Sequence, residues 1–230
     1  MSEENKMVFS NIHRRYDLMN SLFSLGIDSS WRKEAAAEAL LDKEKYRILD
    51  TGCGTGELTI ALLREAKSNG KEVEVEGIDI NDDMLEVARK KINSKGLGEI
   101  KLSLCDALNL NYKNSSFDVV TSAFALRNFD DLDRYVGEVK RVLKKDGKFV
   151  FLEMGMPEKG AWRYFFRIYL RFVKLGGRLT GKNAYSWLVY SIMNFDKKRL
   201  HSILREKGFR DIKEKRLTTQ LAYVVSGRRT

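Results

Sequence analysis

The run Arg47-Ile-Leu-Asp-Thr-Gly-Cys-Gly-Thr-Gly56 decides the fold class. Its apolar beginning predicts a buried strand over Tyr46–Asp50, and glycines follow at positions 52, 54 and 56. Glycine is required where the backbone turns sharply and a ligand must approach without a Cβ in the way. A helical pattern starts directly afterwards, at Glu57. A glycine loop after a first strand is ambiguous by itself, so its neighbours must be read as well.

Short apolar runs alternate with longer helical patterns on both sides of this loop. Alternation of this kind predicts a mainly parallel sheet with helices on both faces, because neighbouring parallel strands need a crossover helix between them. The predicted strands are Tyr46–Asp50, Val73–Asp79, Ile100–Leu104, Phe117–Ala123 and Lys148–Glu153, and the predicted helices are Glu57–Lys67, Asp82–Asn93 and Leu132–Leu143.

The chain beyond Pro157 changes character. A helical insertion is predicted from about Trp162 to Ser191, followed by a helix over Asp196–Lys207. Two last strands, Asp211–Leu217 and Gln220–Ser226, leave no room for a crossover helix between them. We therefore expect them to form an antiparallel hairpin.

Three acidic residues follow successive predicted strands and suit three parts of one ligand. A dinucleotide fingerprint starting at Gly52 would need a glycine where the chain has Glu57. The GxGxG loop after Asp50 instead suits S-adenosyl-L-methionine, whose methionine carboxylate would face the helix N-terminus while Asp50 accepts from its ammonium group. Asp79 would accept from the ribose hydroxyls, and Asp106 from the adenine amino group.

The alternative interpretation is that these acids are ordinary turn residues, since Asp is common at strand ends. Their order behind the glycine loop favours a cofactor site. No metal is expected, because neither cysteine belongs to a CxxC pair or a Cys/His cluster. The predicted cofactor-binding residues are Asp50, Thr51, Gly52, Cys53, Gly54, Gly56, Asp79, Ile80, Met84, Asp106, Ala107 and Ser122.

The glycine run and its followers resemble motif I of class I S-adenosylmethionine-dependent methyltransferases, and Arg141–Gly147 resembles the turn before their fifth strand. The resemblance implies an α/β, Rossmann-like fold. Its mostly parallel sheet would have seven strands and end in an antiparallel hairpin. N-terminal helices and a helical insertion after the fifth strand would complete the fold.

More specific segments resemble the ubiquinone/menaquinone biosynthesis C-methyltransferase family, from about Phe9 to Phe209. They are Arg15-Tyr-Asp-Leu-Met-Asn20 with Trp31-Arg32, Phe117-Asp-Val-Val-Thr-Ser-Ala-Phe-Ala-Leu-Arg-Asn-Phe129, and Leu152-Glu153 near Pro157. Two segments depart from the family pattern. Leu-Glu-Met-Gly-Met-Pro157 replaces a more polar version that contains serine, and the tail Thr218-Thr-Gln-Leu-Ala-Tyr-Val-Val lacks the usual glycine and histidine.

The resemblance implies methylation of a ring carbon in a prenylated quinol, with demethylmenaquinol as the leading candidate. A quinol hydroxyl resembles a phenol with a pKa of about 10, so forming the reactive phenolate at pH 7 costs about 4 kcal/mol. A fixed cation would stabilise the phenolate. Arg127 is the candidate, with Asn128 orienting the ring or a water; the alternative for Arg127 is a surface ion pair with Asp130 or Asp131.

The N-terminal segment supplies the remaining catalytic candidates. Apolar side chains from Phe9 to Leu22 recur at steps of three and four and predict a helix. It carries His13, a candidate base or a solvated surface residue, and Tyr16, which would orient the substrate or pack in the core. A second helix is predicted over Trp31–Leu41, with Ser29 or Ser30 as its N-cap.

The predicted insertion has the composition of a membrane-surface helix. Basic groups on one helical face would meet anionic head groups, while aromatics on the other would meet the acyl boundary. The alternative is that the aromatic face packs on the sheet. The basic residues are Arg163, Arg167, Arg171 and Lys174, and the apolar ones are Trp162, Phe165, Phe166, Tyr169, Phe172 and Val173.

The whole composition fits one intracellular domain. The 230 residues, 43% of them apolar, suffice for one core, divided into an N-terminal helical cap (1–45), a cofactor-binding core (46–157), a helical insertion (158–195) and a final helix and hairpin (196–230). Two cysteines and no signal-like or membrane-spanning stretch lead us to expect a cytoplasmic protein, with contact to the inner face of the membrane left open. The sequence does not choose between monomer and homodimer.

The formal charge of +10 would attract nucleic acid and anionic lipid alike. Two functions therefore compete with methylation of a quinol. Methylation of another lipid or small molecule is one rival, suggested by the divergent tail, and RNA methylation is the other. We expect no nucleic-acid partner, because no nucleic-acid module is appended and the basic stripe is interleaved with an aromatic face.

Overall fold

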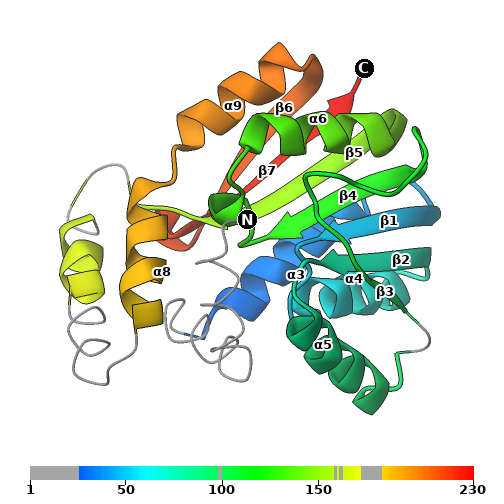
Figure 1. The fold of residues 1–230 in the computed structure, drawn as a ribbon, viewed down its shortest axis with the longest axis horizontal. Coiled ribbons are helices and arrows are strands. Elements are labelled where there is room, and N and C mark those ends of the chain that lie inside the picture. Colours follow the sequence, from blue (N-terminus) through cyan, green and yellow to red (C-terminus); the bar gives the residue numbers. More distant parts are fainter. Residues whose placement is uncertain (1–25, 98–99, 158–159, 161–162, 172–182) are drawn as a thin grey trace.

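A computed structural model describes residues 26–97, 100–157, 160, 163–171 and 183–230. Its strands form one seven-stranded sheet in the order β3-β2-β1-β4-β5-β7-β6 (Figure 1). Neighbours from β3 to β5 are parallel, while β7 runs antiparallel to both β5 and β6. The predicted fold class and hairpin are confirmed. The bounds are β1 Lys45–Thr51, β2 Glu72–Asp79, β3 Lys101–Leu104, β4 Phe117–Ala123, β5 Leu143–Met154, β6 Phe209–Leu217 and β7 Ala222–Arg229.

Helices cover both faces of the sheet (Figure 1). On one face, α3 (Asp28–Ala39) and α4 (Glu57–Ser68) bury apolar side chains against the central strands, and α5 (Asp82–Ser94) packs beside α4. On the other face lie α6 (Leu132–Val142) and α9 (Lys197–Glu206). Apolar residues of α6 and α9 recur at helical spacing, so each helix has one apolar face, and this face lies flat on the sheet.

Helix α3 and strand β5 both begin at other residues than the sequence predicted. The predicted N-caps, Ser29 and Ser30, were wrong: α3 begins at Asp28, and Ile27 at its N-cap position accepts the first backbone hydrogen bond, from Trp31. Strand β5 begins at Leu143, five residues before the predicted start at Lys148. Leu143 already pairs with β4 before the chain makes a tight turn, so the pairing extends beyond the apolar run.

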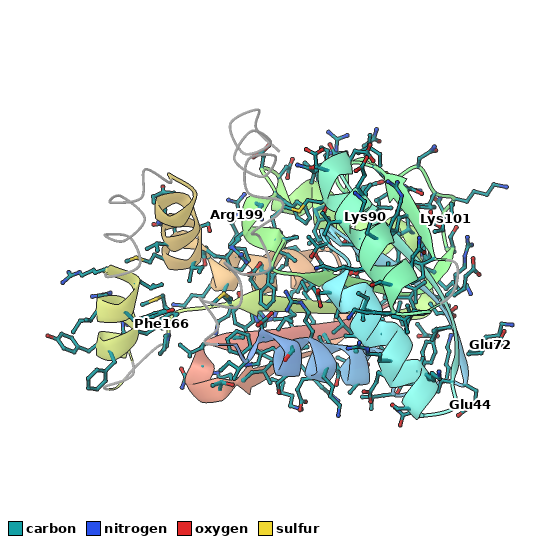
Figure 2. The ribbon with its side chains drawn as sticks, turned by 90° about the horizontal axis from the view of Figure 1, so that it is seen from below. Glu44, Glu72, Lys90, Lys101, Phe166 and Arg199 are labelled. Atoms are coloured by element: carbon teal, nitrogen blue, oxygen red, sulfur yellow. The ribbon has the colours of Figure 1, made fainter. Side chains whose placement is uncertain are left out.

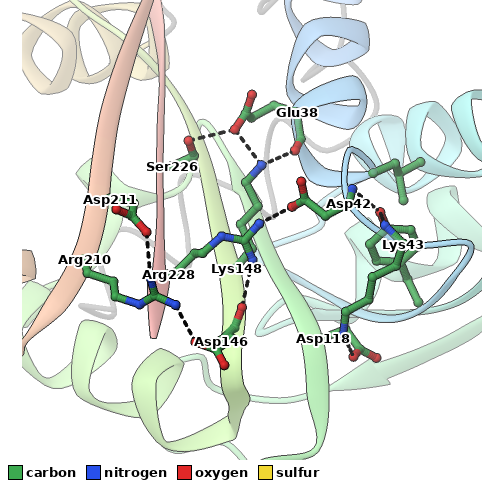
Figure 3. A network of polar contacts seen from close by, with 12 residues as sticks. Glu38, Asp42, Lys43, Asp118, Asp146, Lys148, Arg210, Asp211, Ser226 and Arg228 are labelled. Atoms are coloured by element: carbon green, nitrogen blue, oxygen red, sulfur yellow. Dashed lines mark hydrogen bonds and ion pairs between the residues drawn. The ribbon is translucent and has the colours of Figure 1, made fainter. Parts of the chain in front are cut away.

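Ionic contacts tie α3 and the segment after it to the sheet (Figure 3). Lys148 on β5 is buried, and its Nζ lies 2.6 Å from a carboxylate oxygen of Glu38 on α3. Ser226 on β7 donates to the same carboxylate at 2.9 Å. Lys43 pairs with Asp118 on β4 at 2.6 Å. Because buried charges are tolerated only when paired, these contacts fix where α3 sits, and α3 in turn carries residues of the site.

The insertion divides into two described helices, one at 163–171 and α8 (Asn183–Asn194). Phe166 and Leu170 are buried against the face of the sheet that α3 and α4 cover, and Tyr169 packs beside them. Phe166 lies at the end of the molecule opposite Glu72 and Lys101 (Figure 2). In the described part of the chain, no helix combines the length and apolarity needed to cross a membrane.

The predicted two-sided pattern of the insertion holds only in part. The arginines at 163, 167 and 171 are exposed, as expected. The aromatic face is split, however, because Phe166 packs on the core while Phe165 is 61% exposed beside Tyr164 at 68%. Trp162, Phe172, Val173 and Lys174 lie outside the described residues.

Candidate active site

The glycine loop between β1 and α4 has the geometry that its sequence requires. Gly52, Gly54 and Gly56 all have positive φ, between +54° and +81°. A Cβ at Gly52 would lie 2.7 Å from the Cβ of Ala125, which leaves room for no side chain. A Cβ at Gly54 would meet nothing within 4 Å, because this residue borders open space.

That open space is a cavity of about 880 Å³ over the carboxyl ends of β1, β2 and β4. Ligands of open α/β sheets bind at this edge of the sheet. The cavity brings together nine of the predicted cofactor-binding residues, namely Asp50, Gly52, Cys53, Gly54, Asp79, Ile80, Met84, Asp106 and Ala107.

Asp50 is the most deeply placed acid of the cavity, with no exposed surface. Its two carboxylate oxygens accept hydrogen bonds from the hydroxyls of Thr59, at 2.7 Å, and Thr121, at 2.9 Å. Burial raises the pKa of Asp50 to about 6, although these two hydrogen bonds lower it in part. The carboxylate is therefore mainly ionised at pH 7 and held rigidly at the cavity floor.

Asp79 is fixed at the end of β2 by backbone donors. Gly54 N–H donates to one carboxylate oxygen at 2.8 Å, and Asn81 N–H donates to the other at 2.9 Å. Burial raises the pKa of Asp79, and the backbone hydrogen bonds oppose that rise. Since each carboxylate oxygen has two lone pairs, the group keeps capacity to accept from a vicinal diol.

Asp106 and its neighbours form the third side of the cavity. Asp106 accepts from Leu108 N–H at 2.9 Å through one oxygen, which holds the side chain at the end of β3. Ala107 is buried next to it, and Cys105 lines the same wall. The three acids predicted from strand ends are thus gathered around one space.

Three predicted cofactor-binding residues lie outside the cavity lining. Thr51 is buried, and its hydroxyl bonds Thr121 O and the hydroxyl of Tyr135. Ser122 donates to Thr51 O at 2.8 Å. Gly56 is the N-cap of α4, where a Cβ would come within 3.2 Å of Ala88. These residues shape the loop from behind instead of facing a ligand.

Several lining residues were missed by the sequence reasoning. Arg32 reaches the cavity from α3, where it pairs with Asp28 and places its guanidinium 5.0 Å from the ring centre of Phe124. The Trp31-Arg32 pair was singled out only as a family feature, and nothing in its spacing indicated contact with the cavity. Further lining residues are Thr55, Glu57, Leu58, Asn81, Cys105, Ala123, Ala125 and Phe129.

The candidate catalytic residues after β4 point in different directions. Asn128 lines the cavity, and its side-chain oxygen has no partner among the described residues. Arg127 forms a buried ion pair with Glu153 of β5, and its side chain is 1% exposed. The surface ion pair with Asp130 or Asp131 is therefore wrong. The guanidinium lies inside because Glu153 neutralises it there.

The other two catalytic candidates, His13 and Tyr16, lie outside the described residues. Among the residues that are described, no group of three or more His, Cys, Asp or Glu side chains could hold a metal ion. The catalytic candidates that the structure does place are thus Arg127 and Asn128.

The cavity fits a nucleoside with an amino-acid arm. It offers a carboxylate at each of three strand ends, a loop in which Gly52 and Gly54 leave the backbone open to a ligand, and an apolar wall that includes Met84 and Leu58. A dinucleotide would need a pyrophosphate next to these carboxylates, which would repel it. This set of hydrogen-bond acceptors agrees with S-adenosylmethionine, which offers an ammonium group, ribose hydroxyls and an adenine amino group.

Comparisons with known proteins agree with this site. A sequence model of the ubiE/COQ5 methyltransferase family matches residues 1–228. The demethylmenaquinone methyltransferase of Deinococcus radiodurans is 40% identical over 207 residues, which cover 88% of this chain and 83% of the relative. The enzyme of the same name from Thermus thermophilus is 39% identical, with 88% and 91% covered.

Solved structures support the fold. A SAM-dependent methyltransferase from Aquifex aeolicus superposes with a TM-score of 0.62 at 16% identity, covering 86% of this chain and 89% of that one. Phosphoethanolamine N-methyltransferase 2 from Haemonchus contortus gives 0.63 at 17% identity, covering 87% and 52%. Together with the match over nearly the whole sequence, the fold and the strand-end carboxylates lead to one conclusion: the chain belongs to the ubiE/COQ5 methyltransferase family.

Proposed function

We propose that this methyltransferase transfers the methyl group of S-adenosylmethionine to a ring carbon of a prenylated quinol, with demethylmenaquinol as the substrate. The observation that carries the proposal is the convergence of Asp50, Asp79 and the Gly52–Gly56 loop on one cavity. Relatives named demethylmenaquinone methyltransferase, 35–40% identical over most of the chain, support the choice of acceptor.

Different residues of the chain bind different parts of the methyl donor in this proposal. Bound S-adenosylmethionine supplies an electrophilic methyl group. Asp50 would accept from its ammonium group, Asp79 from the ribose hydroxyls and Asp106 from the adenine amino group, while the positive N-terminal end of the α4 dipole would favour its carboxylate. Their rigid hydrogen bonds fix the donor, and positioning of this kind supplies about 7–11 kcal/mol of the barrier reduction.

Arg127 and Asn128 act on the acceptor in this proposal. Glu153 binds the guanidinium of Arg127 through Nη1, while Nε and Nη2 have no partner among the described residues. Both N–H groups are buried here; in this proposal they donate to a phenolate oxygen of the bound acceptor, whose formation costs about 4 kcal/mol at pH 7. Asn128 orients the ring from the donor side. His13 and Tyr16 remain candidates for proton removal and for ring orientation.

A labelled-methyl assay on lipid and RNA extracts tests this function. Wild type should place label in a quinone fraction, and Arg127→Ala should lose at least about tenfold of that activity while still binding S-adenosylhomocysteine. An exposed control, Arg205→Ala on α9, should keep full activity. Label in RNA or in another lipid class would overturn the choice of acceptor.

We also propose that the protein is cytoplasmic and meets anionic lipid through the helix at 163–171. Arg163, Arg167 and Arg171 are exposed there together with Tyr164 and Phe165. Exposed aromatics among basic groups are typical of surfaces that bind the membrane interface, where a prenylated acceptor would reside.

Sedimentation with anionic vesicles tests this surface. Replacing the three arginines with glutamate should reduce bound protein by about tenfold or more, since each basic residue contributes about 1 kcal/mol. The matched control replaces Lys67, Lys95 and Lys145, which are exposed elsewhere, with glutamate. Equal loss in both triple variants would indicate an effect of net charge alone and contradict a specific surface.

A further inference from the structure

A second cavity lies between the ends of β5 and β7 and α8. It has a volume of about 540 Å³ and is lined by Met154, Gly155, Met156, Ile192, Met193, Phe195, Lys197, Glu214, Arg216, Gln220, Ala222 and Tyr223. Its wall combines polar groups with methionine side chains, which adapt to irregular ligands. Charged residues from α9 and β6 complete the lining.

Tyr223 is the buried polar group of this cavity. The residue is 4% exposed, and its hydroxyl has no hydrogen-bond partner among the described residues. Leaving a buried hydroxyl unpaired costs about 1–3 kcal/mol, so a residue whose only task is packing would be better served by phenylalanine. The unpaired hydroxyl is the feature that calls for a ligand.

Strand pairing places Tyr223 beside the Arg127–Glu153 ion pair. Glu153 on β5 and Tyr223 on β7 are register partners in an antiparallel ladder, so their side chains lie on the same face. Arg127 lines a neighbouring hollow, and Phe195 lines both spaces. Two groups with unused donors, the Arg127 guanidinium and the Tyr223 phenol, are thus neighbours on one face of the sheet.

The phenol of Tyr223 is held in its protonated form. Burial raises its pKa, and the negative charges of Glu153 and Glu214 raise it further, while Arg127 opposes them. Lys197 lies over the ring, with Nζ 5.2 Å from the ring centre. At pH 7 the group is therefore a hydrogen-bond donor, which suits an oxygen acceptor on a ligand.

Gly155 makes the position of this ring possible. A Cβ at Gly155 would come within 2.9 Å of Cε1 of Tyr223 and 3.2 Å of Cδ1. The Tyr223 ring therefore occupies the space that a side chain at position 155 would fill.

We propose that Tyr223 is an acceptor-specificity residue, whose hydroxyl donates a hydrogen bond to an oxygen of the methyl acceptor beside Arg127. This inference rests on the proposed function, because the acceptor is taken to be an oxygen-bearing aromatic ring. Gly155 acts as a positioning residue that leaves space for the phenol ring.

The test is Tyr223→Phe, which keeps the ring and removes only the oxygen. We expect kcat/KM for demethylmenaquinol to fall about tenfold through a higher KM, with unchanged affinity for S-adenosylhomocysteine and a melting temperature that does not fall. Tyr112→Phe is the matched control. Its hydroxyl bonds Glu76, and because neither residue is in the lining of either cavity, the variant should keep wild-type kinetics.

A second variant, Gly155→Ala, displaces the Tyr223 ring without removing its hydroxyl and should also raise KM for the acceptor. Wild-type KM in Tyr223→Phe, combined with increased stability, would show that the hydroxyl contacts no acceptor and would overturn the inference. If wild type itself fails to methylate demethylmenaquinol, the proposed function fails instead, so the two failures are distinguishable.

Discussion

The substitution Gly54→Ala tests whether the glycine loop is shaped for a ligand. Gly54 has φ +54°, and a Cβ added there meets no protein atom within 4 Å. The left-handed backbone costs alanine about 1 kcal/mol, which lowers the melting temperature of a chain of this size by about 2–4 °C. The added methyl group would stand at the wall of the cofactor cavity, so we expect the affinity for S-adenosylhomocysteine to fall at least about tenfold, or about 1.4 kcal/mol.

Gly70 provides a matched control for the backbone strain. It has φ +66°, and its Cβ also meets nothing within 4 Å, but it lies after the end of α4 and away from the cavity lining. Gly70→Ala should therefore lose the same stability of about 1 kcal/mol and retain wild-type affinity.

Isothermal titration calorimetry and thermal melts of the two variants separate the contributions. Equal melting temperatures with binding lost only in Gly54→Ala would agree with a loop that approaches the ligand. Equal affinities in the two variants would refute the reasoning, because the methyl group at 54 would then stand clear of the ligand.

Three further predictions concern buried carboxylates. Asp79→Asn should weaken S-adenosylhomocysteine binding about tenfold by calorimetry and also lower the melting temperature, because the amide nitrogen cannot accept the hydrogen bond from one of the two backbone N–H groups. Unchanged affinity would contradict the contact between Asp79 and the ribose. Burial raises the pKa of Asp50 to about 6, so wild-type affinity should fall about tenfold per pH unit below pH 6, whereas Asp50→Asn should show a flat profile. Burial raises the pKa of Asp118, but hydrogen bonds from Lys144 and Lys43 lower it to about 2. The ionised carboxylate should therefore contribute about 1 kcal/mol of stability above pH 4, and this contribution should be lost as the pH falls towards 2. The same stability difference between wild type and Asp118→Asn at pH 7 and at pH 2, measured by urea melts, would contradict this.

The parallel core and its cofactor edge were predictable because their signals are local. The run from Arg47 to Gly56 fixes a strand, a loop and a helix by itself. Once neighbouring strands are taken as parallel, their carboxyl ends meet at one edge. This is why Asp50, Asp79 and Asp106 were expected together and are found around one cavity.

The surroundings of Arg127 could not be predicted, because they depend on contacts between distant segments. Glu153 lies 26 positions further along the chain, and only the register of β4 and β5 brings it to Arg127. The pairing of Glu153 with Tyr223 depends in the same way on the register of β5 and β7. A spacing pattern carries no information on either register.

The insertion was hard to interpret because apolar residues occur all around its helix. Phe165 and Phe166 are consecutive, so they point in directions about 100° apart and cannot share one buried face. The structure buries Phe166 with Leu170, four residues later, and leaves Phe165 exposed. Helical spacing predicted an amphipathic helix, but the sequence did not indicate which aromatic side chain meets the core.

The central claim is methyl transfer to carbon, and one product analysis tests it most directly. Purified protein would be incubated with S-adenosylmethionine labelled with carbon-13 in its methyl group and with demethylmenaquinol in anionic vesicles. We predict that NMR and mass spectrometry will locate the label on a ring carbon of the quinone. A labelled methyl ether, or no labelled quinone from folded protein that binds the cofactor, would contradict the account.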